Sequence, residues 1–279
     1  MAQASIPVDL LNPGQVFACM GFLEAADVLL GEAEGGFDWT SEAVPRFEIR
    51  AKGDDDPCGT VLEFLTTAQL DRIVPEDFAD TLPDDGPLCV VDTFTAPRAD
   101  PKALPVRLKR EIKRLDVTHW CDASSRNSFK LFAGQQRSAS IAQQMLAEVR
   151  TLWDDRREDL LADPLGLTMP LGGSTFKFDV RKSWTALDAG YSPDEQTHVV
   201  EASPVVEILA AIGLEHARPD EFETREVRYG VWQGRLPPVL ARPVLGAVSV
   251  GVPMRVFRFT LDLAGKNKIV TFAREETQP

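Results

Sequence analysis

A basic segment in the middle of the chain contains the residue types best suited to bind a polyanion. Between Lys102 and Arg137, nine Lys and Arg side chains stand against three acidic ones, in a chain whose formal net charge is −13. Clustered cations of this kind bind the phosphates of nucleic acid. The predicted nucleic-acid-binding residues are Arg107, Lys109, Arg110, Lys113, Arg114, Arg126, Lys130 and Arg137.

Aromatic residues are interleaved with these cations. Aromatic faces can stack unpaired bases while neighbouring cations hold the phosphates. The candidate stacking residues are Trp120, Phe129 and Phe132. The alternative is that these rings belong to the core and that the cations form a solvated face opposite the acidic first hundred residues, because runs of charge usually face solvent.

A second basic block lies near the C-terminus. Residues 225–274 carry nine basic and two acidic side chains, whereas residues 1–101 carry five basic and twenty acidic ones. Arg255 and Arg258 are three residues apart, so in a regular strand they point to opposite faces, and the same holds for Arg225 and Arg228. The sequence therefore predicts no continuous arginine stripe in this block.

Signatures of catalysis are missing from the sequence. It has no Gly-x-x-x-x-Gly-Lys-Ser/Thr phosphate loop, no Gly-x-Ser-x-Gly elbow and no His-Glu-x-x-His pair. His119, two residues before Cys121, and His198 are interpreted as structural, because an acidic chain places carboxylates near histidines by chance. Acidic clusters at 54–56, 84–85 and 154–155 are interpreted as solvated, because metal sites need ligands from rigid elements. We expect a non-catalytic protein without cofactor or metal, and a metal-dependent nuclease is the enzymatic alternative.

The composition points to a protein of the cytoplasm. The first residues lack the basic start and apolar core of a signal peptide, and no apolar run approaches the length of a membrane span. The cysteines are widely spaced, without a Cys-x-x-Cys pair, so reduced and mostly buried thiols are expected. They are Cys19, Cys58, Cys89 and Cys121.

The elements that must position these residues indicate an α/β or α+β fold with a mixed sheet. Helices are predicted at 12–30, 60–70, 138–159 and 204–214, and also directly after Pro105, where apolar and basic residues alternate. Strands are predicted at 5–11, 46–51, 88–92, 118–122, 176–181, 225–232 and 254–263, the last forming a terminal hairpin with 269–274. The chain thus begins β-α-β-α. A single large domain is expected, with a subdivision at 165/166 as the alternative, and residues 75–105, rich in Pro and Asp, are expected on the surface.

Several segments resemble a small family of CRISPR-associated proteins from type I-G effector operons, formerly called type I-U. The most specific of these segments is Asn12-Pro13-Gly14-Gln15-Val16-Phe17 with its flanks. Others are Phe129-Lys130-Leu131-Phe132-Ala133-Gly134, Phe176-Lys177-Phe178-Asp179, Asp188-Ala189-Gly190-Tyr191-Ser192-Pro193, the stretch 204–214 and Leu236-Pro237-Pro238.

The resemblance implies a subunit of, or an accessory to, a Cascade-type RNA-guided surveillance complex in antiviral defence. Its expected partners are other Cascade subunits and guide RNA or target DNA, with no membrane, and catalysis is expected from a separate helicase-nuclease. Many subunits of such complexes have ferredoxin-like folds of the RNA-recognition type. A subunit that docks on proteins through its acidic N-terminal region, without touching nucleic acid, is the alternative.

Overall fold

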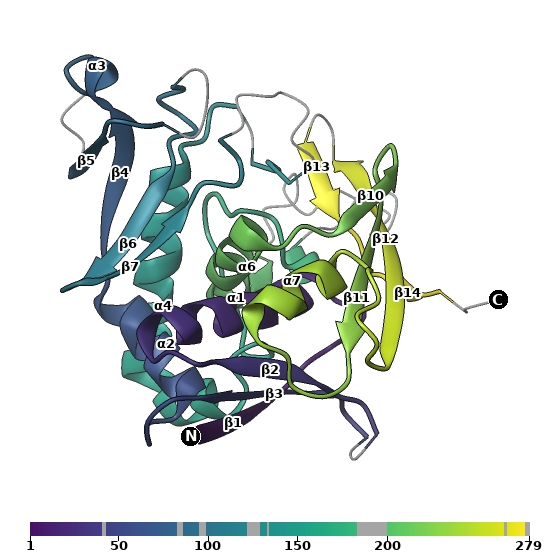
Figure 1. Cartoon of the computed structure of the whole chain (residues 1–279). Coiled ribbons are helices and arrows are strands. Elements are labelled where there is room, and N and C mark those ends of the chain that lie inside the picture. Colours follow the sequence, from purple (N-terminus) through teal and green to yellow (C-terminus); the bar gives the residue numbers. More distant parts are fainter. Residues whose placement is uncertain are drawn as a thin grey trace.

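The protein has an α+β fold in which helices and several β-sheets share one core (Figure 1). The computed structural model describes residues 1–40, 43–82, 86–94, 99–121, 129–132, 134–182, 200–264 and 267–276. One hydrophobic cluster draws on residues from Ile6 to Ala273, so segments from both ends of the chain pack together. The predicted fold class is confirmed.

Two buried helices, α1 (Pro13–Leu29) and α6 (Pro204–His216), lie side by side at the centre. Both were predicted, and both begin as expected: Asn12 and Ser203 accept backbone N–H bonds as N-caps. Glycines let them approach closely, because a Cβ at Gly21 would lie 2.0 Å from the carbonyl oxygen of Leu209. A Cβ at Gly213 would similarly lie 2.2 Å from the carbonyl oxygen of Phe17. Helices with apolar residues all round are core elements.

The N-terminal sheet consists of β1 (Ala2–Pro7), β2 (Glu34–Asp38) and β3 (Arg46–Ala51), in the order β1-β3-β2. Helix α2 (Pro57–Thr67) follows. The order β1-α1-β2-β3-α2 is that of a ferredoxin-like unit, but β4 (Gln69–Pro75) joins another sheet, so the four-stranded unit is not completed. The predicted β-α-β-α start lacked β2. That strand contains Gly35 and Gly36 in place of an alternating pattern, and a Cβ at Gly36 would clash with the backbone of Gly234.

The second sheet is mixed and has the order β5-β4-β6-β7, with β5 at Leu88–Val91, β6 at Val106–Arg110 and β7 at Lys113–Val117. The helix predicted after Pro105 is wrong, because β6 and β7 form an antiparallel hairpin that turns at Glu111, where φ is 55°. Val106, Leu108, Leu115 and Val117 face the core. The strand predicted at 118–122 is also wrong, because β7 ends at Val117. In the predicted surface segment, α3 (Glu76–Ala79) buries no residue, whereas residues 103–105 are buried.

The C-terminal sheet contains β10 (Asp220–Glu223), β11 (Glu226–Trp232), β12 (Met254–Ala264), β13 (Asn267–Val270) and β14 (Arg274–Glu275). The strands run in the order β10-β11-β12-β13, and β14 also pairs with β12. The predicted terminal hairpin is confirmed by the pairing of β12 with β13. Helix α7 (Pro238–Leu245), which the sequence did not indicate, packs against β11.

The remaining elements lie, along the chain, between the second sheet and the C-terminal sheet. Helix α4 (Ser138–Ala162) confirms the predicted helix and kinks at Arg156. Strands β8 (Met169–Pro170) and β9 (Glu201–Ala202) pair with each other. The strand predicted at 176–181 is wrong, because Lys177 has a φ of 68° and Val180–Lys182 form a 3-10 turn, η1.

Candidate nucleic-acid interface

The cations at the base of the β6–β7 hairpin, hereafter the basic hairpin, are held by carboxylates of the protein itself. Arg107 faces Asp116 across the hairpin and donates to both of its oxygens, at 2.6 and 2.7 Å. This contact raises the pKa of Arg107. Lys109 reaches Asp71 on β4 at 2.5 Å, and the Asp71 side chain is almost fully buried. These two positive charges are therefore compensated within the fold.

At the tip of the basic hairpin, the positive charges are only partly neutralised by the protein. Arg110 contacts Glu63 of α2 at 3.2 Å, and Lys113 donates to the carbonyl oxygen of Val28 at 2.8 Å. Arg114 is exposed, and its side chain has no hydrogen bond or ion pair with the described residues. Ile112, between them, is 89% exposed. Of the predicted cations on this hairpin, Arg114 is the one that the described structure leaves free for an external phosphate.

The other predicted cations do not extend this surface into one site. Lys130 lies over the ring of Phe132, 4.7 Å from its centroid. Arg137 is the residue before α4 and has partners of its own. Arg126 lies outside the described residues.

The three predicted stacking rings belong to the core, so the expectation that they present faces to bases is corrected. Trp120, Phe129 and Phe132 are 2%, 7% and 4% exposed. The Trp120 indole donates to the carbonyl oxygen of Leu104 and stacks on Phe176 at a centroid distance of 5.2 Å. Aromatic rings between cations are thus core residues here, which was the alternative interpretation of the sequence.

The C-terminal block contains a different arrangement, which we call the arginine row: Arg228, Arg258 and Arg274. Arg228 on β11 pairs with Arg258 on β12, and Arg258 pairs with Arg274 on β14, so three guanidinium groups extend from the same face of adjacent strands. Arg228 contacts Glu276 at 3.1 Å and lies over the ring of Phe222. The side chains of Arg258 and Arg274 make no hydrogen bond or ion pair with any described residue.

The arginine row shows what sequence spacing could and could not indicate. Arg255 lies on the opposite face from Arg258, as expected, and forms a two-pronged ion pair with Glu275. The stripe along one strand is absent, but a row across three strands replaces it. No signal in the sequence identified this row, because it depends on the register of the two-residue strand β14.

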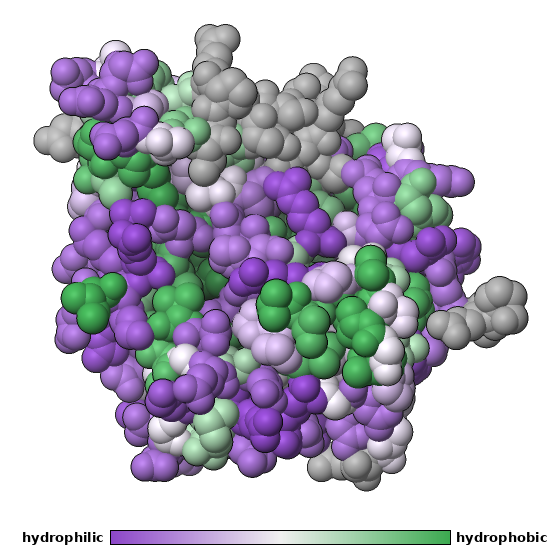
Figure 2. Space-filling view, viewed as in Figure 1, coloured by the Kyte–Doolittle hydropathy of each residue, from purple (hydrophilic) through white to green (hydrophobic). Residues whose placement is uncertain are grey.

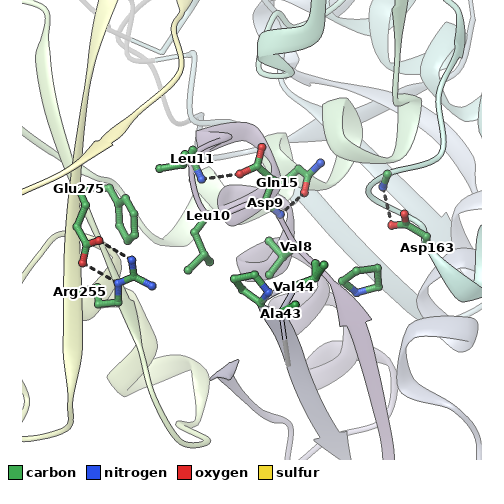
Figure 3. A pocket seen from close by; sticks show the side chains of 14 residues that line it. Val8, Asp9, Leu10, Leu11, Gln15, Ala43, Val44, Asp163, Arg255 and Glu275 are labelled. Carbon is green, nitrogen blue, oxygen red and sulfur yellow. Dashed lines mark hydrogen bonds and ion pairs between the residues drawn. The ribbon is translucent and has the colours of Figure 1, made fainter. Parts of the chain in front are cut away.

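A cleft of about 600 Å³ opens beside the end of β1, with walls from β12 and β14 (Figure 3). Its lining is mostly apolar, and its polar groups bond to one another: the Asp9 backbone N–H donates to the Gln15 side chain at 2.7 Å, and the Leu11 N–H donates to the Asp9 carboxylate. Arg255 faces Glu275 across one wall. These contacts leave the cleft without a free cation for phosphate among the residues drawn.

Buried polar groups elsewhere hold the two central helices together. Asp179 accepts hydrogen bonds from the Asn12 side chain at 3.2 Å and from the Ser203 backbone at 2.9 Å, and it pairs with Arg181. Glu207 accepts from the Asp179 backbone, and burial raises the pKa of Glu207 to about 7. The carboxylate of Asp179 therefore lies at the N-termini of α1 and α6, where negative charge is favourable.

The histidines and cysteines offer no metal centre within the described ranges. No group of three or more His, Cys, Asp or Glu side chains there could hold a metal ion. Burial and nearby Arg218 lower the pKa of His119 to about 3, which keeps the ring neutral. His198 lies outside the described residues. Cys19, Cys58 and Cys121 are buried free thiols.

Comparisons of the chain with protein-family models, curated proteins and solved structures each returned no match. A helix long and apolar enough to cross a membrane is not found in the described parts of the chain.

Proposed function

We propose that this protein is a non-catalytic nucleic-acid-binding subunit of, or accessory to, a type I CRISPR RNA-guided surveillance complex. The observation that supports this proposal is the arginine row, because Arg258 and Arg274 lie side by side in a strongly acidic chain and no described carboxylate pairs with either of them. Like charges directly opposite on neighbouring strands destabilise a sheet unless something neutralises them. A bound phosphate backbone would supply that neutralisation.

The family resemblance suggests the complex to which the protein would belong. The way such complexes hold nucleic acid then determines which side chains the interface needs. In such complexes base pairing reads the sequence while protein side chains hold the backbone. Contacts of this kind need exposed cations more than a closed pocket, and they release counterions on binding. Arg274 and Arg114 are exposed and Arg258 is half-exposed, so these three side chains provide such cations on the surface of the protein.

The decisive experiment is a titration of short labelled RNA and DNA with the full chain, followed by fluorescence anisotropy over a range of salt concentrations. We expect affinity that falls steeply with salt, and a double variant Arg258→Glu/Arg274→Glu that binds weakly and with a smaller salt slope. Arg156→Glu is the matched control, because Arg156 is an exposed arginine of α4, remote in sequence from the row. Absence of binding by the unaltered protein and by the complex that copurifies with it would contradict the proposal.

A protein-docking subunit without nucleic-acid contact is the second candidate, because apolar side chains gather on the surface over α7 (Figure 2). Val239 and Leu240 of α7 and Val248 just after it are 66%, 43% and 54% exposed. Crosslinking of the purified complex separates the two candidates: adducts between nucleic acid and the C-terminal sheet support the first, and protein adducts alone at α7 support the second.

The nuclease alternative is tested directly by incubating the protein with labelled RNA and DNA in magnesium or manganese. We expect both substrates to stay intact. Cleavage that copurifies with the protein would overturn the non-catalytic assignment.

A further inference from the structure

An exposed aromatic side chain lies next to the arginine row. Phe272 is 58% exposed, and no other described Phe, Tyr or Trp is as exposed. It precedes Arg274 by two residues, so their Cα atoms are at most about 7 Å apart. A ring and a free guanidinium therefore share one small area of surface.

The register of the strands explains why Phe272 is exposed. Leu261 pairs with Val270, and Arg258 pairs with Arg274. Two residues of β12 therefore face three residues on the returning strand, as in a β-bulge, which inserts one residue and redirects a side chain. The three residues are Thr271, Phe272 and Ala273.

Hydrogen bonds hold the residues on both sides of Phe272, so Phe272 is the residue whose side chain the bulge redirects. The Thr271 hydroxyl bonds to both the backbone N–H and the carbonyl oxygen of Thr260, at 3.2 and 2.9 Å. Ala273 is buried, and its N–H donates to the carbonyl oxygen of Leu11 at 2.8 Å. The exposed ring is thus held on an anchored backbone, which reduces the entropy lost when a ligand stacks on it.

A second ring near the row is already occupied. Phe222 on β10 has the guanidinium of Arg228 4.0 Å from its centroid, so that face is covered by the protein itself. Phe272 has no ring partner and no cation over it among the described residues. An exposed, unoccupied ring beside free cations is the arrangement that stacks an unpaired base while phosphates are held nearby.

We infer that the outer face of the C-terminal sheet binds a single-stranded segment of nucleic acid, with one base stacked on Phe272 and adjoining phosphates on Arg258 and Arg274. This inference rests on the proposed function and adds the kind of nucleic acid. Bases inside a duplex are stacked on each other and cannot accept a protein ring, so a duplex would use the cations alone.

The test compares single-stranded RNA, single-stranded DNA and a duplex of the same sequence by anisotropy at one moderate salt concentration. The full chain should bind a single strand more tightly than the duplex, and Phe272→Ala should weaken single-strand binding by about 5- to 150-fold. Phe272→Trp should retain binding, since it keeps a flat ring. Val239→Ala is the control, because it removes exposed apolar surface on α7, outside the C-terminal sheet.

A fluorescent adenine analogue in the strand gives a second readout, because stacking on a ring quenches it. Quenching by the unaltered protein and by Phe272→Trp, but not by Phe272→Ala, supports the inference. A stronger effect with RNA supports guide RNA as the source of the strand, and a stronger effect with DNA supports a displaced or target strand. Thermal unfolding of each variant verifies that an exposed substitution leaves the fold intact.

The outcomes distinguish this inference from the function on which it rests. If Phe272→Ala binds single strands as well as the unaltered protein while Arg258→Glu/Arg274→Glu does not, the stacking site is wrong and the nucleic-acid function stands. Equal affinity for duplex and single strand also overturns the inference. If neither the unaltered protein nor the complex that copurifies with it binds any of the three nucleic acids, the proposed function itself is overturned.

Discussion

The basic hairpin and the arginine row are both rich in cations, yet the fold treats them in opposite ways. On the hairpin, Arg107 and Lys109 are each matched with a carboxylate from a neighbouring strand position. In the row, Arg258 and Arg274 face like charges instead. The comparison shows that net charge along a segment does not measure the charge that is free to bind a ligand.

The physical cause is competition for the same cation. A guanidinium already bonded to two carboxylate oxygens gains little from a phosphate, because the internal pair must first be broken. A guanidinium without a partner loses only its hydration and gains a charge-assisted contact. The larger basic island of the sequence therefore contributes fewer accessible cations than the pattern indicated.

The sharpest test of the comparison is charge reversal on each surface. Arg258→Glu/Arg274→Glu should lower nucleic-acid affinity by about 100-fold and reduce the slope of log affinity against log salt by about 2. Arg107→Glu/Lys109→Glu on the hairpin should change affinity much less. Anisotropy titrations over several salt concentrations measure both. A larger loss for the hairpin variant would reverse the comparison.

A change of pH should affect stability through a buried core group, whereas the arginines of both surfaces stay charged. Because the pKa of Glu207 is raised to about 7 from its usual 4.5, the folded protein binds a proton that the unfolded chain has released, and the stability from this group is lost as pH rises through that interval. Relative to Glu207→Gln, the unaltered protein should lose about 2 kcal/mol of unfolding free energy between pH 5 and 7.5.

The comparison with Glu207→Gln is needed because His119 acts in the opposite direction. Its pKa is lowered to about 3, so its contribution to stability is lost as pH falls below the ordinary value of 6.5. Urea unfolding of both proteins at several pH values isolates Glu207. A constant difference between them would contradict the raised pKa, whereas the arginines of both surfaces stay charged throughout.

Removing the best-paired cation of the hairpin should cost stability and leave binding intact. Arg107→Ala breaks the two-pronged contact with Asp116, and the unfolding free energy should fall by about 1.5 kcal/mol. Arg114→Ala is the matched control from the same hairpin, with an expected change within about 0.5 kcal/mol. Chemical denaturation measures both values. Equal effects for the two variants would show that the Arg107 pair contributes nothing.

The smallest expected effect has the opposite sign. Arg258→Gln removes a cation that lies between two others, so it should stabilise the fold by about 0.2–1 kcal/mol while weakening nucleic-acid binding. Denaturant midpoints and anisotropy on the same preparation measure the two effects together. Loss of stability in this variant would indicate that the row is compensated by contacts within the fold.

Much of the fold was predictable from local patterns, and the errors have a common cause. The helices α1, α4 and α6 and the β12–β13 hairpin were predicted because periodicity, caps and turn residues agree within each segment. At 106–117 the apolar spacing suits a helix or a hairpin, and pairing with β4 decides for the hairpin. Strand β2 was not predicted, because its glycines break the alternating pattern and allow close packing against the backbone of Gly234.

For the candidate site, too, the sequence indicated local features and missed those that depend on contacts between distant segments. The sequence indicated two basic blocks, and it correctly placed Arg255 and Arg258 on opposite faces. It could not show that Trp120 and Phe132 are buried, because a ring beside cations has the same spacing in a core as on a surface. It also could not bring Arg274 beside Arg258, since that contact depends on strand pairing.

By itself the sequence determined the mixed helix and strand content, the apolar central helices with their caps, and the uneven distribution of charge along the chain. Only the tertiary structure decided which cations form ion pairs with carboxylates of the protein and which have no such partner among the described residues. The physical reason is range: periodicity and capping act over a few residues, whereas charge compensation acts across space, between residues such as Lys109 and Asp71. The lack of a described partner for Arg258 and Arg274 is therefore a property of the fold and not of the segment that encodes them.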